Sequence, residues 1–273
     1  MTDALRYEWA RIITIRSTYW LTGLALAFAM LVAGAASWGF ATEADGGGGS
    51  QAQLGLDLLG PWLGTQFARG GAPYFVGYLL AMIGILAWGH EYRHGQIRAT
   101  LTTLSSRTSV WIAKYVVVNA WVAAVVSACY WVAVLVGVVW LRNYPADLVT
   151  GETVGGWGRA VLHAGLLCSL AMAFTGIIRN QTAGLVLLFL WPLAIENVIT
   201  LIFFLVPRLR EHEALTRFLP FGAGNRIHSD AFPNLGSTTF GDPLTWVGGL
   251  VVFGGLTVVL MAVSVVLFRR RDA

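Results

Sequence analysis

The sequence predicts an all-α integral membrane protein, and three observations support this fold class. Of the 273 residues, 56% are hydrophobic and 12% are charged, and the mean hydropathy of +0.67 lies above that of ordinary soluble domains. Apolar runs of about 18 residues or more recur along the chain, which is the length that a helix needs to cross a bilayer. The runs are too continuous for the alternating strands of a membrane barrel. We expect one transmembrane domain over residues 1–273.

The chain begins with a segment, residues 1–17, that predicts an amphipathic helix lying in the membrane interface. Arg6, Arg11 and Arg16 recur at five-residue intervals among leucine, tryptophan and isoleucine. A cleavable signal peptide is the alternative. The apolar run that follows, residues 18–40, is too long for a signal sequence and long enough to span, so we favour the interfacial helix.

The apolar runs predict six membrane-spanning helices, at about residues 18–40, 73–88, 115–141, 157–178, 182–206 and 244–268. In the first span, small residues recur every four positions, which suits either close helix packing or a generic alanine-rich span. These residues are Ala25, Ala29, Ala33 and Ser37. Only three residues separate the fourth span from the fifth, so these two are predicted to form an antiparallel hairpin.

Two connectors carry local signals of their own. The GGGGS run at residues 46–50 is a flexible linker by composition, whether natural or inserted, and a short interfacial helix is predicted at 54–63. Between the fifth and sixth spans, Pro207 suits a helix start. An amphipathic helix is predicted over 208–219, ending before Pro220.

The distribution of charge predicts the orientation in the membrane. With six spans both termini lie on one side, and 11 of the 18 arginines and lysines fall on that side. The positive-inside rule then places both termini and the loop after the second span in the cytoplasm. The basic residues flank apolar spans, so orientation explains the net charge of +4 better than nucleic-acid binding does. Cys129 and Cys168 lie inside apolar runs and are expected to be buried thiols.

The most basic polar stretch between two apolar runs is residues 90–114, HEYRHGQIRATLTTLSSRTSVWIAK. Its four basic residues stand against a single acid, Glu91. Gly95 and the two serines at 105 and 106 predict a division into two short helical pieces, about 97–104 and 108–114. The stretch is either a solvated connector or a docking surface.

The same stretch contains His90-Glu91-Tyr92-Arg93-His94, which matches the H-E-x-x-H pattern of zinc hydrolases. On a helix this spacing places two imidazoles on one face, with the glutamate as general base. No later histidine or aspartate stands in a supporting motif, and Gly95 weakens a helix at that point. An intramembrane zinc hydrolase built on His90, Glu91 and His94 is therefore the alternative function, while we expect neither a metal nor a catalytic site.

Three polar residues inside the predicted spans are candidates for a translocation path: Glu196, Asn197 and Asn119. Glu196 is the only acid well inside a span, and it follows Pro192, a predicted kink. Because an intramembrane carboxylate is costly, it faces either a structural partner or a substrate, and we favour the structural role. For Asn119 we favour a hydrogen bond in helix packing.

Three stretches resemble the type-2 permease family of bacterial ATP-binding-cassette exporters. Residues 8–20, from EWAR to RSTYW, are similar to the family's E-W-x-K/R…R-S-T-x-W start. Residues 91–101, EYRHGQIRATL, continuing to Arg107 and Lys114, are similar to its E-Y-R-x-G-x-I-R-x-T-L…R…A-K loop. Residues 217–224, RFLPFGAG, are similar to its L-P-x-x-A-G segment. The two serines before Arg107 replace a proline that the family often has.

The resemblance implies that two segments connect the chain to a separate ATPase. The N-terminal helix would be the connecting helix, with Glu8, Trp9, Arg11 and Arg16. The loop after the second span would hold the coupling helix, and short helices re-entering from outside would precede the sixth span. The candidate ATPase-coupling residues are Glu91, Arg93, His94, Gly95, Arg98, Thr100, Arg107 and Lys114. By charge, the arginines suit an acidic ATPase groove, and Glu91 is a candidate partner for one of them.

The expected function is the permease subunit of an ATP-driven exporter in the bacterial inner membrane, with no catalytic activity of its own. The chain has no G-x-x-x-x-G-K-[ST] motif, so ATP and magnesium would be bound by the ATPase. The other expected partners are a second permease, identical or related, and the lipid bilayer, but no nucleic acid. Apolar, aromatic-rich spans favour an amphipathic or lipid-like cargo such as a drug, antibiotic or lipid. A non-transporting membrane scaffold is a third interpretation.

Overall fold

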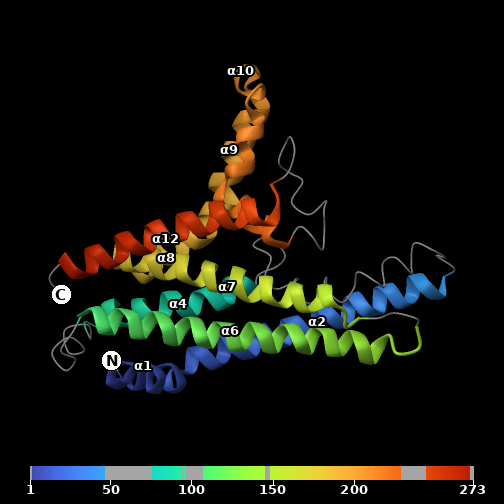
Figure 1. Cartoon of the computed structure of the whole chain (residues 1–273), viewed down its shortest axis with the longest axis horizontal. Coiled ribbons are helices and arrows are strands. Elements are labelled where there is room, and N and C mark those ends of the chain that lie inside the picture. Colours follow the sequence, from blue (N-terminus) through green and yellow to red (C-terminus); the bar gives the residue numbers. More distant parts are fainter. Residues whose placement is uncertain are drawn as a thin grey trace.

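The structure is a computed structural model, and it describes residues 2–46, 76–93, 95, 107–144, 148–228 and 244–270. Every regular element in these ranges is a helix. Five of the described helices are long and apolar enough to cross a membrane, so length and composition indicate an integral membrane protein. They form an elongated bundle with both termini at the same end (Figure 1). Residues 47–50 of the GGGGS run and the helices predicted at 54–63 and 97–104 lie outside the described residues.

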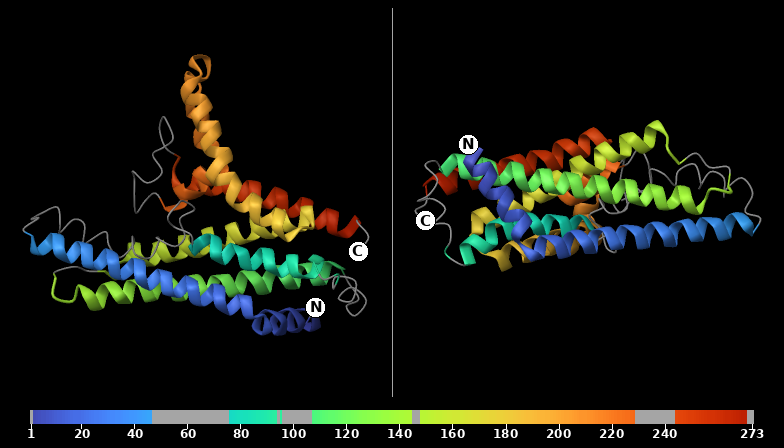
Figure 2. Two further views of the ribbon diagram at one scale, coloured as in Figure 1. Left: turned by 180° about the vertical axis from the view of Figure 1, so that it is seen from behind. Right: turned by 90° about the horizontal axis from the view of Figure 1, so that it is seen from below.

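The N-terminal segment folds as two helices, α1 (Thr2–Thr14) and α2 (Arg16–Asp45), with Ile15 between them. α1 lies at an angle to α2 across the end of the bundle (Figure 2). The first span thus extends five residues past the predicted end. The four small residues of the stripe, from Ala25 to Ser37, are all buried in α2, and α2 packs along α6. Of the two alternatives that the sequence left open, this burial favours close packing.

α4 (Val76–Arg93) corresponds to the second predicted span and is enclosed by its neighbours. Eleven of its 18 residues are buried, and it packs against α2, α6, α7 and α8. Its last turn carries His90, Glu91 and Arg93, which lowers its hydropathy, so α4 is not one of the five apolar helices. That α4 also crosses the membrane, which would give six spans, therefore stays a prediction.

α6 (Arg107–Trp140) joins the third predicted span to the helical piece predicted at 108–114. The prediction of a separate short helix at 108–114 is therefore wrong. Val110, Ala113 and Val117 are buried and continue one face of the span at helical spacing, so nothing in the packing interrupts the helix. The paired serines at 105 and 106 precede α6 and do not divide it.

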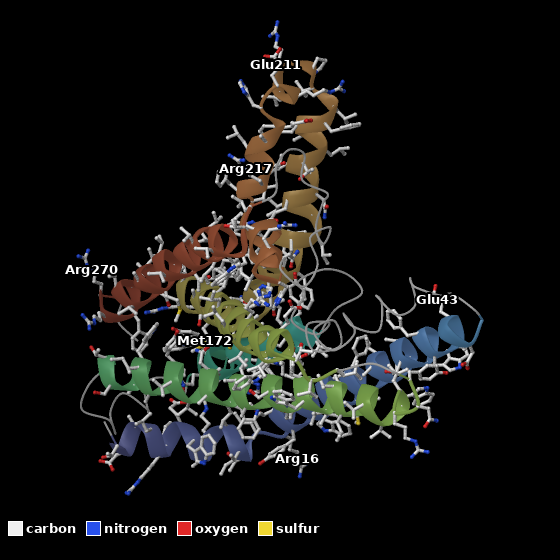
Figure 3. The ribbon with its side chains drawn as sticks, turned by 45° about the vertical axis from the view of Figure 1, so that its right-hand side comes forward. Arg16, Glu43, Met172, Glu211, Arg217 and Arg270 are labelled. Carbon is white, nitrogen blue, oxygen red and sulfur yellow. The ribbon has the colours of Figure 1, made fainter. Side chains whose placement is uncertain are left out.

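α7 (Gly151–Ile178) begins six residues before the predicted span, because Thr150 caps it. The Thr150 hydroxyl accepts the backbone N–H of Thr153, and the Thr153 hydroxyl accepts the N–H of Thr150, which is a capping box. α7 is the most deeply buried of the five apolar helices. In its most hydrophobic 18-residue stretch 67% of the residues are buried, against 22% in the last helix. Figure 3 shows Met172 of α7 inside the bundle.

The fifth predicted span is broken in the middle. It consists of α8 (Gln181–Leu190), a π-helical turn (Trp191–Ile195) and α9 (Glu196–Leu205). Pro192 has no backbone N–H to donate, so the α-helical ladder is interrupted there. The predicted kink is confirmed. Beyond it, α9 leaves the bundle at a steep angle and carries α10 (Pro207–Arg210) at its tip (Figures 1 and 2).

The prediction of one amphipathic helix over 208–219 is wrong. The chain turns after α10 and returns as a 3₁₀ segment, Glu213–Phe218, along α9. His212 has non-helical backbone angles, and the Arg210 guanidinium donates to the Phe204 carbonyl, which closes the turn. Figure 3 shows Glu211 at the tip of this arm and Arg217 on its returning side.

The last three elements among the described residues are α11 (Pro220–Asn225), a 3₁₀ turn (Arg226–His228) and α12 (Trp246–Arg270). Short helices before the last span were predicted, and they are present; their re-entry from the outer side stays a prediction. α12 crosses α11 closely at Gly249, where a Cβ atom would lie 2.3 Å from the Ala223 carbonyl oxygen. It then runs back to the end of the bundle that holds the N-terminus (Figure 1).

Candidate functional site

Four charged side chains from three helices meet inside the bundle, close to the end that holds both termini. Glu8 and Arg11 come from α1, Glu91 from α4 and Lys114 from α6. Lys114 is completely buried, Glu91 and Glu8 are 1% and 4% exposed, and the Arg11 side chain is 12% exposed. We call these four residues the ionic quartet.

The sequence of α1 turns two of these charges inward. Ala4, Glu8 and Ile12 recur every four residues and are the buried positions of α1. Arg11 lies three residues after Glu8, on the same side of the helix. α1 therefore combines exposed aromatic residues, Tyr7 and Trp9, with a charged buried face that needs partners from other helices.

The other two charges belong to the helix ends that flank the basic loop. Glu91 lies in the last turn of α4, three residues after the buried Trp88. Lys114 lies in the second turn of α6, three residues after Trp111. The quartet therefore joins α1 to the helix that enters the loop at residues 94–106 and to the helix that leaves it.

The contacts within the quartet alternate in sign. Lys114 Nζ donates to Glu8 Oε1 at 2.7 Å and to Glu91 Oε1 at 2.8 Å. Arg11 Nη1 donates to Glu91 Oε1 and lies 3.6 Å from Glu8 Oε2. Each carboxylate thus faces both cations, and the formal charge of the quartet is zero.

Burial of four charges costs free energy of solvation, and the alternation of cations and carboxylates in the quartet offsets that cost. Desolvation of one buried ion costs several kcal/mol, which its partners repay only with close, well-oriented contacts. Lys114 Nζ also lies 5.2 Å from the centroid of the Trp88 ring, a cation–π contact. Trp88 packs edge-on against Phe268 of α12, at a centroid distance of 5.1 Å. The surroundings of the quartet therefore extend to the last helix.

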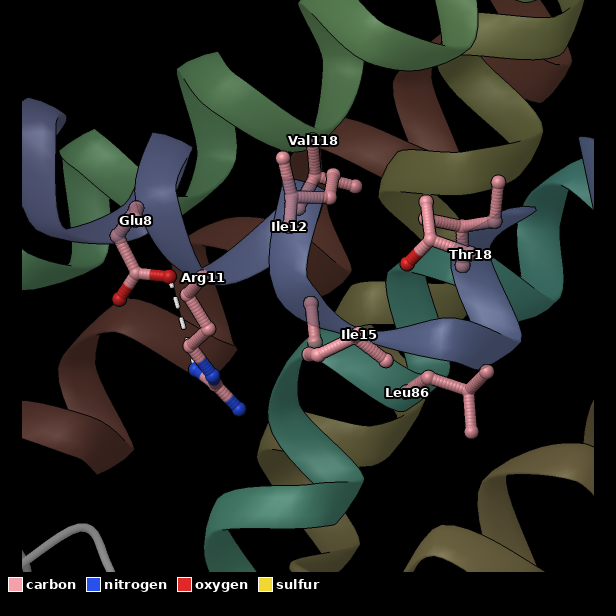
Figure 4. Close-up of a pocket in the computed structure, with 9 residues that line it drawn as sticks. Glu8, Arg11, Ile12, Ile15, Thr18, Leu86 and Val118 are labelled. Atoms are coloured by element: carbon pink, nitrogen blue, oxygen red, sulfur yellow. Dashed lines mark ion pairs between the residues drawn. The ribbon is translucent and has the colours of Figure 1, made fainter.

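A small cavity lies beside the quartet, lined by Glu8 and Arg11 together with Ile12, Ile15, Thr18, Ile83, Leu86, Ala87 and Val118 (Figure 4). Its volume is about 20 Å³, which matches one water molecule and is far too small for an organic substrate. Glu91 Oε2 and Arg11 Nη2 are buried without a hydrogen-bond partner among the described residues. The arrangement holds α1, α4 and α6 together, and its chemistry is ion pairing.

The geometry gives Glu91 a different partner from the one expected. The sequence suggested pairing with an arginine of its own loop, whereas the carboxylate accepts hydrogen bonds from Arg11 and Lys114. This also bears on the zinc motif, because the Glu91 carboxylate is engaged by two cations. Among the described residues there is no group of three histidine, cysteine or acidic side chains that would hold a metal. His94, the second histidine of the motif, lies outside the described residues.

The remaining coupling candidates surround the quartet without joining it. Trp9 is 48% exposed and packs edge-on against Trp121 of α6, and Arg16 is exposed at the start of α2. Arg93 is exposed at the end of α4, and Arg107 is the first residue of α6. Gly95 has a φ of 64°, the left-handed conformation typical of a residue after a helix end. Arg98 and Thr100 lie outside the described residues.

Glu196 has a structural role at a second junction. Its Oε1 accepts the backbone N–H of Phe221 at 2.7 Å, and its Oε2 accepts that of Gly222 at 2.9 Å. These are donors of the first turn of α11, so the carboxylate caps that helix from α9. Trp191, Phe221 and Phe253 pack around this junction. We call Glu196 with the first turn of α11 the carboxylate cap.

The three residues proposed for a translocation path each have hydrogen-bond partners of their own, which for Glu196 are the two N–H groups of α11. Asn197 donates to the carbonyls of Pro192 and Leu193, which the π-helical turn leaves available. Asn119 lies between α6 and α7, where it donates to the Tyr115 carbonyl and accepts from the Ser169 hydroxyl. Both side chains thus have hydrogen-bond partners within the fold.

The quartet itself was missed as a unit, although all four residues were candidates. Glu8 and Arg11 were assigned to one segment, and Glu91 and Lys114 to another. The available signal was Lys114, a charge placed on the buried face of an apolar helix, which requires acidic partners. Comparisons with known proteins add no assignment: no protein-family model matches the chain, and a search of curated proteins found no match.

Proposed function

We propose that this chain is the membrane-spanning permease subunit of an ATP-driven exporter, powered by a separate ATPase. The observation that carries the proposal is the ionic quartet. It fixes an amphipathic N-terminal helix to the two helices that flank a basic loop. A force applied to α1 and the loop would therefore reach α4 and α6 together.

The packing of α4 extends this connection through the bundle. α4 packs along α7, and a Cβ on Gly84 would lie 2.9 Å from the Cys168 sulfur, so the two helices are in close contact. α7 in turn packs against α12, where a Cβ on Gly176 would lie 2.3 Å from the Ser264 hydroxyl. Because interiors this dense do not deform continuously, displacement at one end moves helices as bodies.

The remaining parts of the proposal rest on the sequence motifs. The ATPase would bind ATP and magnesium, and its acidic groove would receive the basic loop. Both termini would lie in the cytoplasm of a bacterial cell, at the inner membrane. A second permease would pack beside this one, and the exposed apolar faces of α2 and α9 are available for that contact. The cargo would be amphipathic or lipid-like.

A pull-down from native membranes tests the proposal. Tagged protein is purified in mild detergent, co-purifying proteins are identified by mass spectrometry, and zinc is measured in the same sample. We expect a stoichiometric ATPase with a phosphate-binding loop, and no zinc. One zinc per chain without an ATPase would overturn the proposal and make His90, Glu91 and His94 the active site. Purification with neither would favour a membrane scaffold.

A further inference from the structure

We propose that an anionic phospholipid headgroup binds at the end of the bundle, in the cavity between the last turn of α4 and the α7–α8 turn. The cavity has a volume of about 490 Å³, which suits a headgroup. It is lined by Tyr92, Arg93, Arg179, Asn180, Gln181 and Thr182. None of these six residues is acidic, and two are arginines, so the cavity carries positive charge.

The position of the cavity follows from close helix packing. At Gly89, α4 lies against the first residue of α8: a Cβ there would be 2.6 Å from Gln181 Cγ. One turn later, Tyr92 and Arg93 extend past α8 and form one wall. The Arg179 guanidinium, from the α7–α8 turn, lies 5.8 Å from the Tyr92 ring centroid. Two arginines from separate elements, Arg93 of α4 and Arg179 of this turn, thus line one cavity.

The backbone around Arg179 favours the same ligand. Arg179 has a φ of 59°, a left-handed conformation that glycine or asparagine adopts far more readily than arginine does. The α8 helix starts two residues later, and the side chain of Asn180 between them caps it by accepting the N–H of Ala183. The first N–H groups of a helix have no intrahelical acceptor and attract a phosphate. Arginine and phosphate also match in geometry, because one guanidinium donates two parallel hydrogen bonds.

A lipid is favoured over free phosphate because an apolar stripe begins at the cavity. Thr182, Val186 and Leu190 recur every four residues along α8 and are its exposed positions. Acyl chains would lie along this stripe while the headgroup occupies the cavity. The α7–α8 turn lies at the end of the bundle that holds the termini (Figure 1), so the leaflet is the one that faces them. A net negative headgroup is required, since a choline group would meet two arginines.

Thermal unfolding of the purified protein in a nonionic detergent tests the inference. The probes are dioleoylphosphatidylglycerol, dioleoylphosphatidylcholine and inorganic phosphate, each titrated separately. We expect phosphatidylglycerol to raise the unfolding temperature, with little effect of the other two. An equal shift with inorganic phosphate would overturn the lipid assignment in favour of a soluble anion.

Variants separate ligand binding from folding. Arg179→Gly suits the left-handed backbone, so without lipid it should unfold at the same temperature as the parent or higher. Its apparent affinity for phosphatidylglycerol should fall at least about tenfold, because charge-assisted hydrogen bonds are lost. Arg93→Gln should show a similar fall, whereas Arg142→Gln, exposed at the other end of α6, should bind as the parent does.

Two further results would overturn the inference. One is an unchanged phosphatidylglycerol shift in the Arg93→Gln/Arg179→Gly double variant. The other is loss of the co-purifying ATPase in that variant with its lipid shift intact, which would assign the cavity to a protein interface.

Discussion

The ionic quartet and the carboxylate cap solve the same problem in different ways. Both hold a nearly fully buried carboxylate in a membrane-spanning bundle. In the quartet, Glu91 is neutralised by Arg11 and Lys114, side chains from two other helices. In the cap, Glu196 is satisfied by two backbone N–H groups of α11. One junction therefore depends on side chains that can exchange partners, and the other on fixed backbone geometry.

This difference suits the positions of the two junctions. The quartet lies where the proposed ATPase would act, and it joins three separate helices that a motion must displace together. The cap lies where α9 departs from the bundle, and it holds a short helix of six residues against a break in the chain. Side-chain ion pairs allow rearrangement between states, whereas a capped helix start preserves one geometry.

The largest expected effect is that of removing the central cation of the quartet. Lys114→Met keeps the approximate volume but leaves Glu8 and Glu91 buried with Arg11 alone. We expect a loss of about 3–5 kcal/mol in the free energy of unfolding, measured by denaturant titration in detergent. Arg142→Gln, an exposed cation outside the quartet, is the control. A loss below about 1 kcal/mol would show that the ions are hydrated in the membrane-embedded protein.

A double variant tests whether the quartet acts as one unit. Glu91→Gln/Lys114→Met removes one charge of each sign and leaves Glu8 and Arg11 as a neutral pair. The double variant should be more stable than the sum of the two single losses implies, by about 0.5–3 kcal/mol. The same denaturant titration gives this interaction energy. Simple additivity would mean that Glu91 and Lys114 act independently.

The carboxylate cap should be less sensitive than the quartet. In Glu196→Gln the amide oxygen still accepts one N–H, but the amide nitrogen faces the other donor. We expect a loss of about 1.5–3 kcal/mol, the range for a charge-assisted hydrogen bond. Unfolding of Glu211→Gln, exposed at the tip of the arm, should be unchanged. A Glu196→Gln variant as stable as the parent would refute the capping role.

The last of the four effects concerns the packing that positions the cap. Gly249→Ala places a methyl group against the Ala223 carbonyl and should cost about 1–3 kcal/mol. Gly255→Ala lies in the same helix, where no atom approaches within 4 Å, so it should be neutral or stabilising by up to about 1 kcal/mol. Equal unfolding midpoints for these two variants would show that α12 and α11 do not make this contact.

Much of the fold could be predicted from the hydrophobic pattern and the local chemistry of the sequence. The helical class and the break at Pro192 follow from the apolar runs and the missing proline N–H. For the stripe from Ala25 to Ser37 the sequence left two alternatives open, and the burial of these residues decides for packing. The direction of α9 after that break does not follow, because residues 198–205 are apolar or neutral on every side. The helix predicted at 208–219 failed for a tertiary reason, since the chain folds back along α9.

The site was predictable residue by residue but not as an assembly. Glu8 and Lys114 are separated by 106 residues, and Arg11 and Glu91 by 80. The residue pattern within one helix does not indicate which distant residues its charged side chains will contact. What the sequence does contain is a lysine on the buried face of α6, and a buried lysine requires acidic partners from elsewhere.

The proposed role of the quartet is to transmit motion from the proposed ATPase to the bundle. The most direct measurement uses the co-purified complex, labelled with a fluorophore at Thr42→Cys near the far end of α2, because Cys129 and Cys168 are buried. ATP should change the fluorescence of the parent. In Glu91→Gln the account predicts continued ATP hydrolysis with that change lost. An ATP-dependent change of full amplitude in Glu91→Gln would contradict the account.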